Sequence, residues 1–224
     1  MARYHSLLHW RKQMPSSGSI TKTMKFGNFQ KRYHYLILDF ESTCEYMVSL
    51  KNQEVIEFPC IWVDSNLNVV STFHKYVKPV YNPVLTPFCT QLTGIVQEMV
   101  EKEETFDQVL SRFLTWIKNT EATIGNQQTK TFITCGDWDL KVMLPNQCKL
   151  SKLPVPPIMT HWLNLKKVFF EYTNYYPKSL KDMCHHLDYK FTGREHSGID
   201  DCRNILEILR ILKARHLILS SKLM

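Results

Sequence analysis

The sequence predicts an α/β fold in one domain, and three observations support this prediction. Two apolar runs of strand length, 34–40 and 55–63, come early in the chain. After Thr105, apolar residues recur at helical spacing, which is typical of a helix packed on a sheet. With 224 residues, 44% of them hydrophobic and 12% aromatic, the chain can bury one substantial core. We find neither an internal repeat nor a second domain in the sequence.

Three strands are expected first, in hairpin-like succession. The runs 34–40 and 55–63 form buried strands, and a third strand covers about 69–78. The third strand ends at Lys78-Pro79, because proline lacks the N–H donor that a strand interior needs.

Helices dominate the rest of the chain. A short helix from Pro87 to Leu92 should end at Thr93-Gly94, since glycine commonly closes a helix. The helix after Thr105 has a buried face that comprises Phe106, Val109, Leu110, Phe113, Leu114 and Ile117. The other expected elements are a strand at 131–135, a helix from Trp138 to Leu144 that stops at Pro145, an extended connection at 153–157, and helices at 161–171, 179–187 and 199–217.

The cysteines and the hydropathy of the sequence predict the cellular location of the protein. The seven cysteines are odd in number and include no Cys-x-x-Cys pair, which argues against a secreted disulfide framework and a zinc ribbon. We therefore expect a reducing intracellular location, cytoplasm or nucleus. No apolar run approaches membrane-spanning length, so we expect a soluble protein that does not bind a membrane.

The formal charge of +7 comes from the start of the chain. Residues 1–38 contain no acidic residue and seven basic ones, namely Arg3, Arg11, Lys12, Lys22, Lys25, Lys31 and Arg32. We interpret 1–32 as a basic, low-complexity leader. Three interpretations stay open for it: a disordered polar tail, an arm that binds nucleic-acid phosphate, or a mitochondrial transit peptide.

A second basic region lies within the body of the chain. Residues 140–194 hold nine Lys and Arg against three Asp and Glu. Such a surface can follow a phosphate backbone, although a merely solvated surface is the alternative for any single lysine. The candidates are Lys141, Lys149, Lys166 and Lys167.

Two carboxylates stand at the end of the first predicted strand. Asp39 and Glu41 follow an apolar run and are two residues apart. Because strand side chains alternate between faces, both carboxylates project to the same side. Such a pair is costly unless a positive charge lies between its members, and these oxygen ligands suit Mg²⁺ or Mn²⁺ better than zinc. The pair therefore predicts metal-assisted chemistry.

Two later segments contribute further candidate ligands. Asp137-Trp138-Asp139 follows the predicted strand at 131–135, and His196-Ser-Gly-Ile-Asp200-Asp201 opens the last predicted helix. Asp137 competes with Asp139 for a place in the site, and Asp200 competes with Asp201. A histidine, with an ordinary pKa of about 6.5, suits a general base near neutral pH.

The motifs occur in the order Asp-x-Glu, Asp and His-x4-Asp. This order resembles that of the DEDDh exonucleases. The resemblance is closer still to the enhanced-RNAi subfamily, which includes the histone-mRNA 3′-exonuclease. The family's Trp-Asp pair favours Asp139, and its His-x4-Asp spacing favours Asp201. The matching stretches span residues 34 to about 215 and comprise 39–44, 54–59, 76–79, 88–89, 92–95, 136–139 and 193–201.

The resemblance implies a ribonuclease-H-like fold, with a mixed five-stranded sheet flanked by helices. The exonuclease domain would cover 33–217, between the leader and a tail at 218–224. The implied activity is 3′-to-5′ exonuclease cleavage of RNA that releases nucleoside 5′-monophosphates, with single- or double-stranded DNA open as a second substrate. The alternative is a catalytically idle nucleic-acid-binding or adaptor module, which is disfavoured because all five site residues are present.

The implied chemistry uses two Mg²⁺ ions, for which Mn²⁺ can substitute. By resemblance, Asp39 contacts both ions, Glu41 and Asp201 help to hold one each, and Asp139 acts directly or through a water molecule. His196 would be the general base that deprotonates the attacking water.

Four residues would contact the terminal nucleotide by the same resemblance: Phe40, Phe88, Thr93 and Trp138. Trp138 would stack on the base, with a place in the core as its alternative. Thr93 would contact the sugar, and Phe40 would contribute its backbone rather than its ring.

Overall fold

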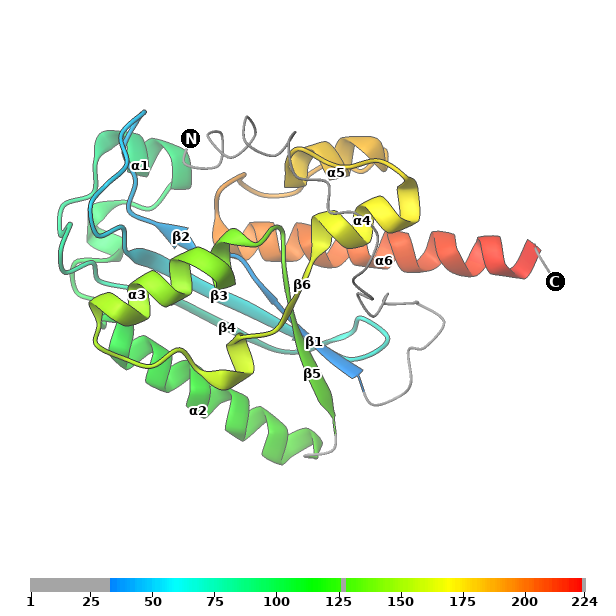
Figure 1. The fold of residues 1–224 in the computed structure, drawn as a ribbon, viewed down its shortest axis with the longest axis horizontal. Helices are drawn as coiled ribbons and strands as arrows, with labels where there is room; N and C mark the ends of the chain where they lie inside the picture. The colour runs from blue at the N-terminus through cyan, green and yellow to red at the C-terminus, as the bar shows by residue number, and fades with distance from the viewer. Residues whose placement is uncertain (1–32, 126–127, 223–224) are drawn as a thin grey trace, which may run out of the picture.

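A mixed sheet forms the centre of the protein, whose computed structural model describes residues 33–125 and 128–222 (Figure 1). The described strands are β1 (Tyr33–Leu38), β2 (Glu41–Ser42), β3 (Val55–Val63), β4 (Val69–Tyr76), β5 (Thr129–Thr134) and β6 (Trp162–Asn164). The strand order is β2-β3-β1-β5-β6, and β4 also pairs with β3. Strand β3 is antiparallel to β1, β2 and β4, whereas β5 is parallel to both β1 and β6. The predicted leader at 1–32 lies outside the described residues.

The predicted α/β class is confirmed, with one strand more than expected among the described residues. Strand β2 is only two residues long and pairs with β3 at Glu41↔Glu57, directly beyond the β1 pairing at Leu38↔Cys60. It therefore lies in line with β1. Asp39 and Phe40 lie between the two strands. The line that β1 and β2 form along β3 is therefore interrupted at Asp39.

Six α-helices surround this sheet in the described part of the chain. They are α1 (Pro87–Thr93), α2 (Phe106–Ile124), α3 (Leu144–Leu150), α4 (Leu165–Thr173), α5 (Leu180–His186) and α6 (Gly198–Lys222). A π-helix at Asp139–Met143 leads into α3, and 3-10 helices lie at Gln97–Met99 and Pro157–Met159. None of the described helices combines the length and the hydropathy needed to cross a bilayer.

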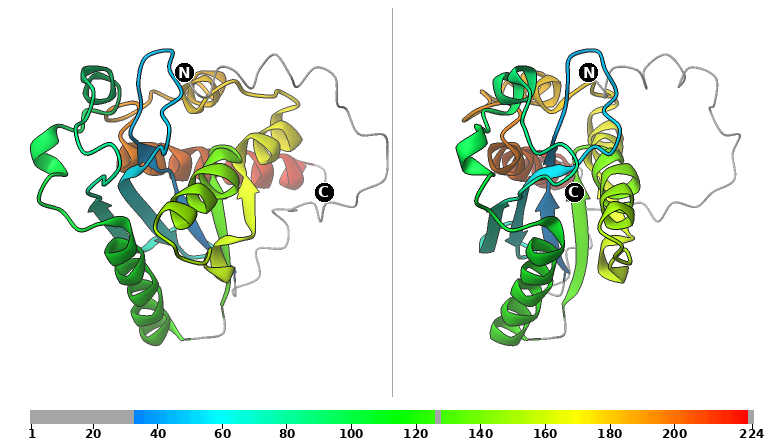
Figure 2. Two further views of the ribbon diagram at one scale, coloured as in Figure 1. Left: turned by 60° about the vertical axis from the view of Figure 1, so that its left-hand side comes forward. Right: turned by 90° about the vertical axis from the view of Figure 1, so that its left-hand side faces the viewer.

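Both faces of the sheet are covered, which explains the unbroken apolar run in β1. Tyr35 and Ile37 belong to the cluster that contains residues of α4, α5 and α6. Leu36 and Leu38 belong to the cluster that contains residues of α2 and α3. Long helices α2 and α6 accordingly lie on opposite sides of the sheet (Figure 2). A strand buried on both faces has no polar alternation, because each successive side chain enters a core.

The bounds predicted for two later helices are wrong. The helix expected at 161–171 begins only at Leu165, because Trp162–Asn164 pairs with β5 as the short parallel strand β6. The Asn164 side chain then caps α4 by accepting the Lys166 N–H at 2.9 Å. Tertiary strand pairing here overrides the local apolar pattern. The last helix also differs, since α6 continues to Lys222 and does not end at 217.

Pro145 does not end the helix that follows Trp138. The residues before it form a π-helix, in which the Leu144 N–H donates to the Asp139 carbonyl. Pro145 then occupies the first turn of α3, directly after the π-helix, and proline is tolerated in the first turn of a helix. The chain can therefore continue helically through the proline.

A group of aromatic rings fills the core on the α2 side of the sheet. Phe113 of α2 is fully buried, and its ring centroid lies 4.6 Å from that of Phe58 and 5.2 Å from that of Phe73. Phe40 closes the group from the loop after β1, with its ring 4.7 Å from Phe58 in an edge-on arrangement. This packing joins α2 to β3, to β4 and to Phe40, the residue after Asp39.

Replacement of Phe113 with alanine should lower the free energy of unfolding by about 3–5 kcal/mol, because it removes a large side chain from a closed core. Chemical denaturation followed by circular dichroism measures this loss. Phe170→Ala is the control, since Phe170 is 44% exposed and its loss should cost about 1 kcal/mol or less. Equal losses for the two variants would contradict the packing described.

Candidate active site

The first two carboxylates lie where β1 gives way to β2. Strand β1 ends at Leu38 and β2 begins at Glu41, with Asp39 between them. Ile37 packs toward the layer of α4, α5 and α6, and the alternation of side chains puts Asp39 on that side as well. Asp39 is completely buried, with 0% exposed, and Glu41 is also buried.

The next two site residues, His196 and Asp201, lie at the start of α6. Asp201 is buried in the first turn, and its N–H donates to the Ser197 carbonyl at 2.8 Å. His196 precedes the helix and has a left-handed backbone, with φ at +65°. Non-glycine residues adopt this region infrequently, and often at functional sites. The turn at His196 places its half-buried side chain beside Asp201.

Glu57 of β3 fixes the start of α6 on the sheet. Its carboxylate accepts the Gly198 N–H at 2.8 Å and the Ile199 N–H at 3.1 Å. The first N–H groups of a helix have no intrahelical acceptor, and a carboxylate there also interacts favourably with the helix dipole. Glu57 is itself buried, is the cross-strand partner of Glu41, and lies 2.8 Å from His74 Nε2.

Gly198 allows this close approach of helix and strand. A Cβ atom at Gly198 would lie 2.5 Å from the Asp39 carbonyl oxygen and 2.9 Å from Pro59 Cγ. The absence of a side chain therefore lets α6 begin directly against the backbone of Asp39.

Asp139 lies in the same region, in the segment that follows β5. It is buried at the start of the π-helix, and its Oδ1 accepts the backbone N–H of Phe40 at 2.9 Å. This hydrogen bond connects Asp139 to the residue between Asp39 and Glu41. Asp139 thus lies next to the first two carboxylates.

Asp137 is engaged elsewhere. Its carboxylate accepts from Trp162 Nε1 at 3.1 Å and lies 3.4 Å from Lys167 Nζ. Burial raises its pKa, but hydrogen bonds from Asn164 and Trp162 and the charge of Lys167 outweigh burial and hold the pKa of Asp137 below its ordinary value. Of the two candidates, Asp139 is therefore the one placed beside Asp39.

Asp200 also has a role separate from that of Asp201. It accepts the Arg194 N–H at 3.0 Å and pairs with Arg203 at 2.7 Å. These contacts close the loop that carries His196, whereas Asp201 points into the protein.

Glu41, His196 and Asp201 form a compact group of potential metal ligands. One ligand atom from each lies within 4.8 Å of the other two. Asp39 is outside this group of three, but its charge and that of Asp201 both act on Cys202, the residue after Asp201. Burial raises the pKa of the Cys202 thiol well above its ordinary value, and the charges of Asp39 and Asp201 both add to the rise.

The four predicted nucleotide-contacting residues lie in different environments. Phe88 lines a cleft together with His196, and Trp138 is half-buried at the edge of the α2-side core. The Phe40 ring is buried in that core. Thr93 is buried, and its hydroxyl donates to the Cys89 carbonyl at 2.9 Å within α1. Phe88 and Trp138 are thus the two of the four whose rings retain exposed surface.

The candidate lysines show local contacts. Lys166 Nζ donates to the Lys178 carbonyl at 2.6 Å, and Lys167 pairs with Asp137. Lys141 and Lys149 lie on the π-helix and on α3. Lys167 is therefore the one of these four that contacts a residue adjacent to the acidic site.

Comparison with known proteins assigns the chain to a family. A family model described as an exonuclease, of the RNase T type, matches residues 36–209. The chain belongs to this exonuclease family. ERI1 exoribonuclease 3 of Homo sapiens is 47% identical over 188 residues, which cover 83% of this chain and 55% of the relative. The 3'-5' exoribonuclease 1 of Homo sapiens is 38% identical and is covered to 54%. The chain spans about half the length of these curated relatives.

A solved structure agrees with this assignment. The nuclease domain of 3'hExo, described as a DEDDh family member bound to rAMP, superimposes with a TM-score of 0.75 at 35% identity. The match covers 80% of this chain and 90% of that domain. The family and the ribonuclease-H-like fold inferred from the motif order are therefore confirmed.

The exonuclease family implies dependence on a divalent metal, and the donor set fits one. The buried groups gathered at the site are Asp39, Glu41, Asp139 and Asp201, with His196 beside them. Carboxylate oxygens are hard ligands that prefer Mg²⁺ or Mn²⁺, and a divalent charge offsets the repulsion between them.

Glu57 has a part in this site that the sequence prediction missed. A charged residue in the middle of the otherwise apolar run 55–63 was the signal that could have revealed it. A buried carboxylate in such a strand requires hydrogen-bond donors, and here the first turn of α6 supplies them.

Gly198→Ala should lower the free energy of unfolding by about 1–3 kcal/mol and weaken Mn²⁺ binding, because the added methyl group forces α6 away from Asp39. Thermal unfolding and Mn²⁺ titration calorimetry measure the two effects. Gly136→Ala is the matched control, since a Cβ at Gly136 meets nothing within 4 Å. If both variants bound Mn²⁺ as the wild type does, the close approach at Gly198 would not matter for the site.

Proposed function

We propose that the protein is a divalent-metal-dependent 3′-to-5′ exonuclease that removes nucleotides from RNA and releases nucleoside 5′-monophosphates. One observation carries the proposal. Glu41, His196 and Asp201, from opposite ends of the chain, come within 4.8 Å in a chain of the exonuclease family. The names of the relatives, exoribonuclease 3 and 3'-5' exoribonuclease 1, support both the direction of cleavage and RNA as the substrate.

Four carboxylates would hold two Mg²⁺ ions, and Mn²⁺ would substitute. Asp39 is central among them, since its backbone touches the start of α6 and its neighbour Phe40 donates to Asp139. Glu41 and Asp201 would each help to hold one ion. When bound, the ions neutralise the phosphate and stabilise the charge that develops on the attacking and leaving oxygens.

His196 would act as the general base. Its side chain lies beside Glu41 and Asp201, where a substrate phosphate must also lie. It would take a proton from water as the water oxygen attacks the last phosphodiester phosphorus. The bond between phosphorus and the 3′-oxygen of the preceding nucleotide then breaks, which leaves the phosphate on the 5′-oxygen of the released nucleotide.

RNA is the substrate class that we propose first, and single- or double-stranded DNA is the second. Substrate choice depends on the loops around the site rather than on the carboxylates. A related structure is described as 3'-end specific recognition of histone mRNA stem-loop by a 3'-exonuclease, and that description applies to the relative alone. The cytoplasmic or nuclear location, with the mitochondrion as the alternative suggested by the leader, stays a prediction.

End-labelled RNA and DNA of matched sequence test the proposed function directly. Cleavage should yield nucleoside 5′-monophosphates from the 3′ end with Mg²⁺ or Mn²⁺ and should stop in EDTA, because buried carboxylates repel a phosphate when no cation is bound. The control is Asp39→Asn, which should bind RNA but not cleave it. Undiminished cleavage by EDTA-treated enzyme would exclude the mechanism, and binding without cleavage by the wild type would favour an idle module.

His196→Ala should lower kcat by about 10²–10⁴-fold and leave KM nearly unchanged, since a general base acts in the transition state and the carboxylates remain in place. Single-turnover kinetics with Mg²⁺ measure the chemical step. His185→Ala is the control, because His185 is an exposed histidine on α5. A proportional loss of RNA affinity and kcat would make His196 a binding residue instead.

A further inference from the structure

A cleft opens beside the carboxylates and carries two aromatic side chains. Its volume is about 690 Å³, and its lining includes Tyr46, Phe88, Arg194, Glu195 and His196. These side chains come from three segments: the loop after β2, α1, and the loop before α6. Because His196 belongs both to this cleft and to the group with Glu41 and Asp201, the cleft adjoins the acidic site directly.

Tyr46 presents its ring at the tip of a small hairpin. Residues Glu45 and Val48 form an isolated antiparallel bridge, and Met47 between them has a left-handed backbone with φ at +54°. Tyr46, Met47 and Val48 are 53%, 72% and 60% exposed. Three successive apolar side chains thus stay in solvent at the edge of the cleft, where they contribute little to the core.

The Tyr46 ring faces the Phe88 ring across this edge. Their centroids are 5.5 Å apart, and the ring planes meet at 61°. Both residues retain exposed surface and line the cleft, where a ligand can reach them. Nucleobases bind such surfaces by stacking, which tolerates any base.

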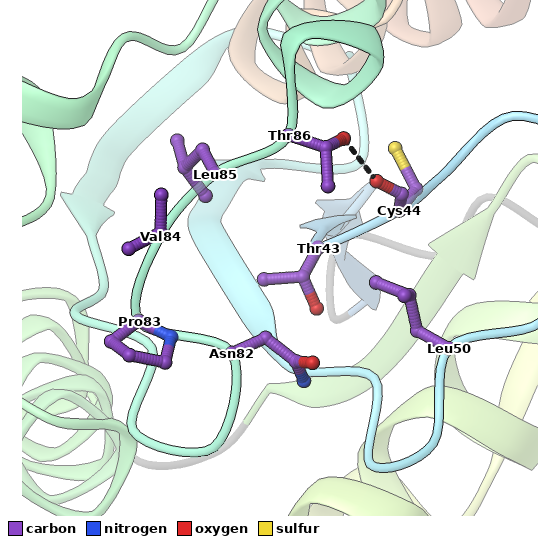
Figure 3. Close-up of a pocket in the computed structure, with 8 residues that line it drawn as sticks. All are labelled: Thr43, Cys44, Leu50, Asn82, Pro83, Val84, Leu85 and Thr86. Carbon is purple, nitrogen blue, oxygen red and sulfur yellow. Dashed lines mark hydrogen bonds between the residues drawn. The ribbon is translucent and has the colours of Figure 1, made fainter.

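A hydrogen bond joins the hairpin to the start of α1. The Thr86 hydroxyl donates to the Cys44 carbonyl at 2.7 Å, as Figure 3 shows, and also accepts the Cys89 N–H at 3.0 Å as the N-cap of α1. In addition, the Cys89 thiol lies 3.7 Å from the Ser42 carbonyl. The two aromatic rings therefore stand on segments that are fixed to each other.

Arg194 connects the loop before α6 to α1. Its Nη2 donates to the Gln91 carbonyl at 2.6 Å near the end of α1, and its backbone N–H donates to Asp200 at 3.0 Å. Arg194 is exposed and lines the cleft, and its acidic neighbour Glu195 is paired with Lys181 at 3.1 Å. An aromatic surface beside a cation suits a nucleotide, whose base stacks and whose phosphate is attracted.

We propose that Tyr46, together with Phe88, contacts a nucleobase directly next to the scissile phosphate, so that Tyr46 determines how strongly the enzyme holds the end of its substrate. The proposal rests on the proposed function. A nucleotide joined to a phosphate at the carboxylates must lie near His196, and the cleft that His196 lines carries the exposed rings of Tyr46 and Phe88. Tyr46 would act by binding the base and not in the chemical step.

Tyr46→Ala should raise KM for a single-stranded RNA by about 5- to 100-fold, the range expected for the loss of one stacking partner, with kcat unchanged within about 3-fold. Tyr46→Phe should retain wild-type KM, because the ring and not the hydroxyl makes the contact. Tyr33→Ala is the control, since Tyr33 starts β1 at the end of the strand away from Asp39.

Abasic substrates separate a base contact from a structural effect. RNAs that lack the base of the last nucleotide or of the nucleotide before it are compared with the intact RNA. On the RNA that lacks the base contacted by Tyr46, wild type and Tyr46→Ala should have the same KM, because the contact between Tyr46 and the base is already absent. A KM difference that persists on both abasic substrates, or that is absent on the intact RNA, would overturn the proposal. If the wild type cleaved no RNA at all, the proposed function itself would fail.

Discussion

The attachment of α6 to the sheet through Glu57 is the interaction on which the site depends. His196 and Asp201 are far in sequence from Asp39 and Glu41, so no local propensity can bring them together. Two backbone N–H groups at the start of α6 donate to one buried carboxylate of β3, and Gly198 lets the helix start directly against Asp39. The contact that fixes α6 on the sheet therefore also fixes the positions of His196 and Asp201.

This arrangement concentrates negative charge in a buried place. Asp39, Glu41, Asp139 and Asp201 are all buried, and like charges at short range in a poorly solvated site repel each other strongly. The fold offsets part of that cost locally, since Asp139 accepts a backbone N–H from Phe40. A divalent cation would offset the rest. On this account the site is destabilised in the absence of metal, and the packing of α2 and α6 on the two faces of the sheet supplies the stability that holds it together.

Local signals made much of the fold predictable. The strand at 55–63 was placed correctly, and Ser179 caps α5 as its sequence position suggests. The predictions failed where long-range contacts decide the structure. Trp162–Asn164 becomes a strand only because β5 lies beside it, and Pro145 is tolerated because a π-helix precedes it.

The same distinction applies to the candidate site. The spacing of Asp39, Glu41, His196 and Asp201 in the sequence revealed the family, and the family's Trp-Asp pair favoured Asp139. The structure adds the hydrogen bonds that place Asp139 beside Phe40 and Asp137 beside Trp162. Glu57 was missed because its role arises from partners that are distant in sequence, and the same holds for the role that we propose for Tyr46. Tyr46 in particular shows no periodicity, since it lies in a hairpin loop whose position depends on Thr86.

The central claim is that buried carboxylates oppose folding until a divalent cation binds them. The most direct measurement is the unfolding free energy of wild type and Asp39→Asn, each in EDTA and in saturating Mn²⁺. We expect Asp39→Asn to be more stable than wild type in EDTA, because it removes one charge from the cluster. We expect Mn²⁺ at 100 times its Kd to stabilise wild type by about 2.7 kcal/mol and the variant by much less. A variant that is less stable in EDTA and gains as much from Mn²⁺ as wild type would contradict the account.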